Sequence, residues 1–113
     1  MTATNLLIWQ AKRTDETRQV EEVLRKGGFA TVDAYRYNAA SIRVRVVDPR
    51  FEDLPSDKRD EMVEPLLEAL PERTQADIMS LFTFAPSELQ QTPKSVRTFH
   101  LNAEFDDPTP SLL

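Results

Sequence analysis

The chain of 113 residues contains no cysteine, only two glycines and no long hydrophobic run. The lack of cysteine excludes disulfides, thiolate zinc sites and all-cysteine iron–sulfur sites. The apolar segment at residues 5–10 is too short for a signal peptide or a membrane span. We therefore expect a soluble, cytoplasmic protein without a membrane segment.

Basic residues are also in deficit, with 14 Lys and Arg against 19 Asp and Glu and a formal net charge of −5. Proteins that bind nucleic acid usually carry a basic face, so this balance makes a nucleic-acid partner unlikely. The remaining composition is that of a globular protein. The length predicts a single domain over 1–113, with a core at about 14–105 and an extended tail at 106–113.

The N-terminal part predicts one helix. Residues 14–26 have an apolar stripe at helical spacing, and the adjacent Gly27 and Gly28 predict where this helix ends. Residues 5–10 before it could form a strand or a helical turn. Within them Trp9 is expected to be a packing anchor.

Two strands are predicted next, at 29–37 and 42–47, joined as a hairpin. In the second strand valine and isoleucine alternate with arginine, so one face meets the core and the other meets solvent or a partner. We expect Arg36, Arg43 and Arg45 to share that second face.

The central helix follows a turn. Its apolar stripe extends to residue 70, and Ser56 is the expected N-cap. Pro65 lies inside the helix and predicts a kink or a break. Pro71 is expected to open a second short helix at 71–76.

The last part predicts two more strands. Residues 78–84 are apolar almost throughout, which is typical of a central, well-covered strand. A helical turn at Pro86 precedes 95–105, where apolar and polar residues alternate, and we expect a fourth strand antiparallel to the third. Leu112 and Leu113 of the tail could dock in a groove.

The fold class is accordingly α+β. We predict a small mixed or antiparallel sheet of three to four strands packed on two or three helices. The expected order is α-β-β-α-α-β-(α)-β.

A local pattern supports a family resemblance. The basic alternating segment SIRVRVV is followed by Asp48, Phe51, a polar loop and Arg59 at the start of a helix. With this pattern, residues 18–88 resemble the BolA-like family, whose fold is a small α+β unit related to the second KH topology. Phe51 and Arg59 keep the family's spacing between its Phe and the Arg of an Arg-His pair.

Two positions depart from that family. Asp53 stands where the family has glycine, and Asp60 stands where it has the histidine that it offers to an iron–sulfur cluster shared with a monothiol glutaredoxin. A carboxylate is a poorer ligand for such a cluster. The resemblance therefore implies the fold and not the cluster, and we expect no cofactor.

The leading prediction is a non-enzymatic binding module whose partner is another protein. Arginine presents a fork of donors to carboxylates and phosphates, so the arginine face and the loop after it form the expected contact surface. The alternative is that this face is solvated and that its arginines pair with acids of the helices. The predicted binding residues are Arg36, Arg43, Arg45, Arg50, Phe51 and Arg59.

Three other possibilities stay open. Single-stranded nucleic-acid binding would use the KH domain's GxxG loop, which this chain lacks. An enzyme or metal protein could use His100, the single histidine, with Glu104 or Asp106. A homodimer could form through the edge of the long last strand at 95–105. We predict no catalytic residue and no metal ligand.

Overall fold

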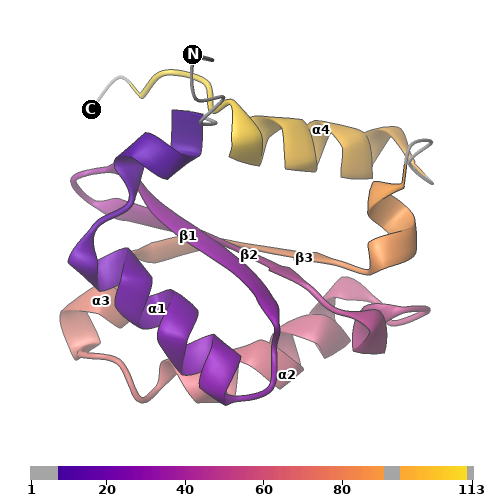
Figure 1. Ribbon diagram of the computed structural model, residues 1–113, viewed down its shortest axis with the longest axis horizontal. Helices are drawn as coiled ribbons and strands as arrows, with labels where there is room; N and C mark the ends of the chain where they lie inside the picture. Colours follow the sequence, from indigo (N-terminus) through magenta and orange to yellow (C-terminus); the bar gives the residue numbers. More distant parts are fainter. Residues whose placement is uncertain (1–7, 91–94, 112–113) are drawn as a thin grey trace, which may run out of the picture.

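The computed structural model describes residues 8–90 and 95–111, which form an α+β fold around a three-stranded sheet (Figure 1). The predicted order α-β-β-α-α-β is confirmed for the chain up to the third strand. The elements in chain order are η1 (Ile8–Lys12), α1 (Asp15–Lys26), β1 (Thr31–Asn38), β2 (Ser41–Val47), η2 (Pro49–Phe51), α2 (Ser56–Leu67), α3 (Glu72–Asp77), β3 (Ile78–Phe84), η3 (Pro86–Leu89) and α4 (Val96–Asp106).

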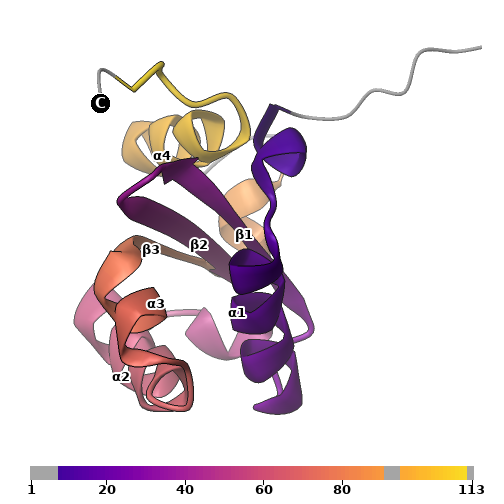
Figure 2. The same cartoon turned by 90° about the vertical axis from the view of Figure 1, so that its left-hand side faces the viewer.

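The sheet is mixed, with the strand order β1-β2-β3. β1 and β2 are antiparallel and form the predicted hairpin, whereas β2 and β3 are parallel. A parallel pair needs a crossover connection, which α2 and α3 supply. β2 is therefore the central strand, and the prediction that 78–84 is central is wrong. β3 is apolar because both of its faces are covered, by α2 and α3 on one side and by α4 on the other (Figure 2).

Two hydrophobic cores lie on opposite faces of the sheet. The smaller one, below η1 and α4, contains Trp9, Tyr35 and Phe105, so Trp9 is a packing anchor as predicted. The larger one lies between the sheet and α1 and α2. Its buried residues are Val20, Leu24, Phe29, Val32, Ala34, Ile42, Val44, Val46, Phe51, Val63, Leu67, Leu70 and Ala85.

The predicted strand at 95–105 is wrong, because this segment forms helix α4. Ser95 is its N-cap, and the Ser95 hydroxyl accepts a hydrogen bond from the Thr98 N–H at 3.0 Å. Phe105 is buried, whereas Phe99 is 55% exposed, so the apolar residues of the alternating pattern do not share one face. The homodimer predicted through this segment loses its basis, since a helix has no free strand edge.

The helix boundaries follow local chemistry. Thr14 caps α1 in a reciprocal capping box with Thr17. At the other end Gly28 has φ of +107°, in the left-handed region that favours glycine, and this turns the chain into β1. Gly27 has a different constraint, because a Cβ there would clash with the Leu66 side chain.

Helix α2 differs from the prediction at its N-cap and at Pro65. Its N-cap is Pro55, which makes no side-chain cap bond, and Ser56 is already the first helical residue. The helix continues through Pro65 to Leu67, so the predicted break does not occur. Only one backbone donor is lost at Pro65. The buried side chains of Val63 and Leu67, on either side of Pro65, pack the helix against the sheet.

The segment after α4 returns over the hairpin. The Tyr37 hydroxyl donates to the Thr109 carbonyl, and the Asn38 amide donates to the Ser111 hydroxyl at 3.1 Å. The predicted docking of Leu112 and Leu113 lies outside the described residues. Across residues 8–90 and 95–111, no helix has both the length and the apolar character needed to cross a membrane.

Candidate functional site

The three arginines predicted to share a face are divided between the two sides of the sheet. Arg43 pairs with Tyr35 across the hairpin, whereas Arg36 pairs with Ile42. The register shifts between Arg36 and Asn38, where β1 has one extra residue. Arg36 therefore lies on the face of Ile42, and the predicted shared surface is wrong.

Arg43 and Arg45 lie beneath α4. Arg43 forms an ion pair with Glu104 at 2.9 Å, and Arg45 forms one with Asp106 at 2.6 Å. The Arg45 guanidinium also lies 4.3 Å from the centre of the Phe105 ring, and its side chain is only 11% exposed. Acids of α4 therefore neutralise these two arginines, and the ion pairs attach α4 to the sheet.

The Arg43–Glu104 pair alters the titration of both groups. Burial opposes the charge on each side chain, but the hydrogen bond between them raises the pKa of Arg43 and lowers the pKa of Glu104. Glu104 additionally accepts hydrogen bonds from the Thr109 N–H and hydroxyl at 3.0 and 2.8 Å. The pair therefore remains charged over the ordinary pH range.

Arg36 joins three elements on the opposite face. Its guanidinium donates to both carboxylate oxygens of Glu16 at 3.0 Å and to Asp77 at 2.8 Å. The hydrogen bond from Arg36 lowers the pKa of Glu16. Arg36 thus connects α1, β1 and α3, and its side chain is mostly buried.

The other three predicted binding residues lie around η2 and the start of α2. Phe51 is fully buried in the larger core. Arg59 is buried as well, and it donates to the Thr83 carbonyl at 2.9 Å and to Glu88 at 2.8 Å. Arg50 is half exposed and pairs with Asp48, whose pKa its hydrogen bond lowers. The six predicted residues therefore do not form one surface.

His100 and Asp60, the two other residues singled out in the sequence, lie on different helices, α4 and α2. His100 is exposed on α4, and the acids suggested as its partners, Glu104 and Asp106, form ion pairs with arginines. Within the part of the chain that the structure describes, no three His, Asp or Glu side chains are grouped so that they could hold a metal ion. Asp60 lies on α2, and one oxygen of its carboxyl is buried without a hydrogen-bond partner among the described residues.

Asp60 should make the stability of the protein depend on pH. Burial, together with the nearby charges of Glu64 and Asp57, raises the pKa of the Asp60 carboxyl above its ordinary value of 3.8. The folded protein then holds this proton more tightly than the unfolded chain does. The free energy of unfolding therefore falls as pH rises from the pKa of this carboxyl in the unfolded chain to its pKa in the folded protein. We expect Asp60→Asn to increase the free energy of unfolding near neutral pH by up to about 0.5 kcal/mol.

Urea denaturation of both proteins over a range of pH measures this effect. The difference between the variant and the wild type should shrink toward acid pH, because the wild-type carboxyl becomes neutral there. A difference that is the same at every pH would show that the charge of Asp60 is not its cause.

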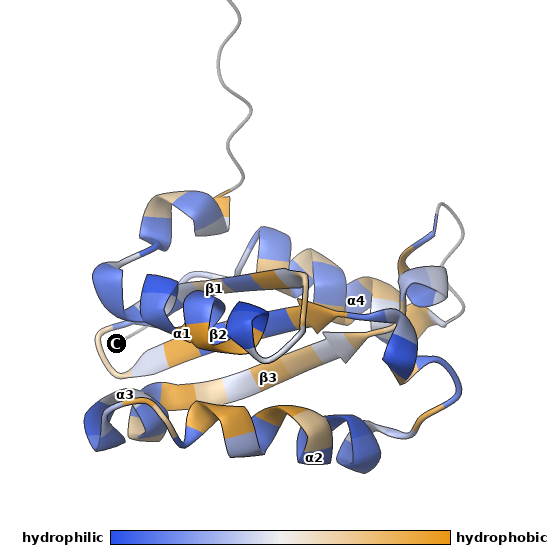
Figure 3. Ribbon diagram, turned by 60° about the horizontal axis from the view of Figure 1, so that its bottom comes forward, coloured by the Kyte–Doolittle hydropathy of each residue, from blue (hydrophilic) through white to orange (hydrophobic). Residues whose placement is uncertain are grey.

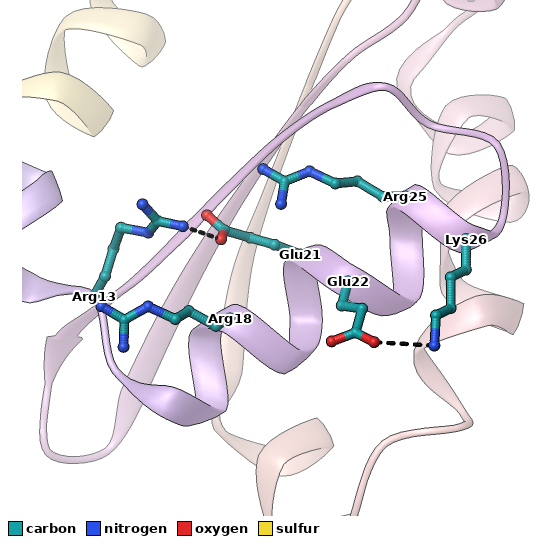
Figure 4. A pocket seen from close by; sticks show the side chains of 6 residues that line it. All are labelled: Arg13, Arg18, Glu21, Glu22, Arg25 and Lys26. Carbon is teal, nitrogen blue, oxygen red and sulfur yellow. Dashed lines mark hydrogen bonds and ion pairs between the residues drawn. The ribbon is translucent and has the colours of Figure 1, made fainter.

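A cleft of about 450 Å³ opens beside the outer face of α1 (Figure 4). Its lining residues are Arg13, Arg18, Glu21, Glu22, Arg25 and Lys26. Three of its cations form the ion pairs Arg13–Glu21, Arg18–Asp15 and Lys26–Glu22. Because the fourth, Arg25, donates to the Val32 carbonyl, the cleft is a network of internal contacts.

The same network occupies the outer edge of β1. The Ala34 N–H donates to Glu21 at 3.0 Å, and Arg25 donates to the Val32 carbonyl at 3.1 Å. Glu21 reaches the strand from α1 and is only 1% exposed. Side chains therefore satisfy backbone groups of β1 that would otherwise be open to another strand.

The outer edge of β3 is different. The Phe84 carbonyl accepts from the Asp48 N–H and thus points toward β2, so Leu81 and Thr83 direct their backbone groups the other way. The Thr83 carbonyl is occupied by Arg59. No strand of the described ranges pairs with this edge, which leaves the backbone groups of Leu81 and the Thr83 N–H available.

A groove of about 390 Å³ runs along this edge. Its lining residues come from β3 and from the region of the helices α2 and α3. Helix α2 runs alongside the strand (Figure 3). The irregular register between β2 and β3 places Met79 as an extra residue beside the groove, where it is 67% exposed. The lining residues are Glu64, Leu67, Glu68, Gln75, Ile78, Met79, Ser80 and Leu81.

The groove was not predicted from the sequence. The signals that could have indicated it are Glu64 and Glu68, one helical turn apart without a basic residue between them. Comparison with known proteins adds no precedent for the site, because no family model, curated protein or solved structure matches this chain.

Proposed function

We propose that the protein is a non-enzymatic binding module that takes up an extended segment of another protein along the outer edge of β3. The contrast between the two edges of the sheet carries this proposal. Glu21 and Arg25 of α1 occupy the edge of β1, whereas the edge of β3 has available backbone groups at Leu81 beside a groove.

An open strand edge is a template for a further strand. A segment that pairs there gains main-chain hydrogen bonds, and pockets for alternate side chains make the pairing specific. Leu81 supplies an outward N–H and C=O, and the groove can receive every second side chain of the added strand.

Two of the predicted binding residues, Arg59 and Phe51, lie near one end of this edge. Arg59 holds the Thr83 carbonyl and also binds Glu88, which fixes the C-terminal end of β3. Phe51 packs beneath this region in the larger core. Both residues would shape the site without contacting the partner.

The BolA-like resemblance agrees with a binding role. The order α-β-β-α-α-β is compatible with the small α+β unit that the resemblance implies. The turn between α2 and α3 has no GxxG sequence, which argues against the nucleic-acid alternative. A cytoplasmic location is part of the proposal.

A synthetic octapeptide of alternating lysine and valine tests strand addition at β3. We would titrate it into the full ¹⁵N-labelled chain and follow amide shifts and hydrogen exchange by NMR. The amides of Leu81 and Thr83 should shift and exchange more slowly, because they become hydrogen-bonded or covered. The amides of β1 should change little, since Glu21 and Arg25 occupy its edge.

Two N-methylated versions of the peptide provide a matched control. Each carries methyl groups on alternate amides, in opposite phase, so only one version keeps the N–H groups that face β3. We expect one version to bind and the other to fail. Equal binding of both versions, or shifts that do not include β3, would refute strand addition.

A further inference from the structure

We infer that the segment taken up at β3 is basic, with Lys or Arg at every second position over Glu64 and Glu68. This inference rests on the proposed strand addition and names its chemistry. Glu64 lines the groove from α2, Glu68 lines it from the C-cap position after α2, and both are exposed. They form the acidic rim of the groove.

The acids of this rim differ from several others that arginines neutralise. Glu16, Glu21 and Glu104 each pair with an arginine of the same chain. No basic side chain of the described residues forms an ion pair with Glu64 or Glu68. A basic segment from outside would supply these missing partners, although at a partly exposed site each pair adds only modest affinity.

The spacing of the rim matches an extended chain. Residues four apart on a helix are separated by about 6 Å along its axis. Alternate side chains of a strand are separated by about 6.6 Å. Because α2 runs alongside β3 (Figure 3), basic residues at positions i and i+2 of an added strand would reach Glu64 and Glu68 together.

The floor of the groove suits long basic side chains. Leu67 is buried there, and Ile78 and Leu81 are half-buried. Lysine and arginine can lay their methylene stems on such an apolar surface and extend the charged group to its edge. The groove therefore favours these residues over short polar ones.

The same charges disfavour other occupants. A second copy of this chain would bring its own Glu64 and Glu68 and a formal net charge of −5, and β3 contains no basic residue. A nucleic-acid strand would place phosphates against the acidic rim. The basic peptide segment is thus the occupant that the charges select.

Three octapeptides test the inference by fluorescence anisotropy with the full chain. They alternate valine with lysine, glutamine or glutamate. We expect the lysine peptide to bind about tenfold more tightly than the glutamine peptide, and the glutamate peptide to bind most weakly. Added salt should weaken binding of the lysine peptide.

The double variant Glu64→Gln/Glu68→Gln removes the acidic rim. It should bind the lysine peptide about tenfold more weakly than the wild type does. The control Glu22→Gln/Asp53→Asn changes two exposed acids away from the groove by the same total charge, and its affinity should stay within about twofold of the wild type. Thermal unfolding of both variants verifies that they are folded.

The outcomes separate the two proposals. If the glutamine peptide shifts Leu81 and Thr83 and binds as tightly as the lysine peptide, strand addition stands and the basic segment is refuted. If none of the three peptides affects β3, the proposed function fails. Tighter binding of a single-stranded DNA oligonucleotide than of the lysine peptide would also overturn the inference.

Discussion

Replacement of Phe105 with alanine is expected to lower the free energy of unfolding by about 4 kcal/mol. The Phe105 ring is fully buried and lies 4.8 Å from the ring centre of Tyr35 and 5.5 Å from those of Trp9 and Phe82. It is also the buried side chain by which α4 enters the smaller core. The cavity would therefore weaken both the core and the attachment of α4.

Urea denaturation followed by circular dichroism measures this loss. Phe99→Ala is the matched control on the same helix, because Phe99 is 55% exposed, and it should change the free energy of unfolding by no more than about 0.5 kcal/mol. Hydrogen exchange of α4 should accelerate in the Phe105 variant alone. Similar effects of the two substitutions would contradict the position of α4.

Glu21→Ala should cost about 3 kcal/mol of the free energy of unfolding. The carboxylate of Glu21 is buried, pairs with Arg13 and accepts the Ala34 N–H at 3.0 Å. Alanine would leave a buried backbone donor and a partly buried guanidinium without their partner. The edge of β1 would be opened at the same time.

Glu21→Gln separates the two losses. The amide keeps an acceptor for the Ala34 N–H but removes the charge that pairs with Arg13, so we expect a smaller loss than with alanine. Glu22→Ala serves as the exposed control and should lie within about 0.5 kcal/mol of the wild type in urea denaturation. If Glu21→Ala is equally mild, the edge of β1 is not held by this carboxylate.

The sequence predicts the fold best where local signals agree. From 14 to 84 the hydrophobic period changes from helix to strand and back, and each change coincides with a cap, a glycine pair or a proline. All of these elements are present in the structure. The position of β3 at the edge of the sheet could not be predicted, because an apolar strand covered on both faces looks the same at an edge as in the centre.

The error at 95–105 has a specific physical origin. Phe99, Leu101 and Phe105 alternate with polar residues, which is the pattern of a half-buried strand. The pattern treats Phe99 as buried although it is exposed. The capping bond between Ser95 and Thr98 is the local signal for the helix, and the alternation obscured it.

The error at Arg36 arises from a single residue. A regular hairpin with Asn38 opposite Ser41 would place Arg36 opposite Arg43 and on the same face. The extra residue, Tyr37, shifts the register by one position and places Arg36 opposite Ile42. A bulge of this kind leaves no reliable mark in one sequence.

The groove at β3 was missed because it is not local. Glu64 and Glu68 lie on the first helix of the crossover and at its C-cap, whereas Ile78 and Leu81 belong to the strand after the crossover. Their proximity depends on the parallel pairing of β2 with β3, which brings the crossover helices beside the strand edge. The functional proposal therefore depends on the topology more than on any motif.

The position of Trp9 gives the protein an internal optical reporter. The chain has one tryptophan, and its indole lies against Phe105 and 5.6 Å from the Arg45 guanidinium. Release of α4 would expose this indole to water while the opposite layer of the molecule stayed intact. A red shift of the intrinsic emission that precedes the loss of far-UV circular dichroism would thus distinguish detachment of one layer from unfolding of the whole chain, without any added label.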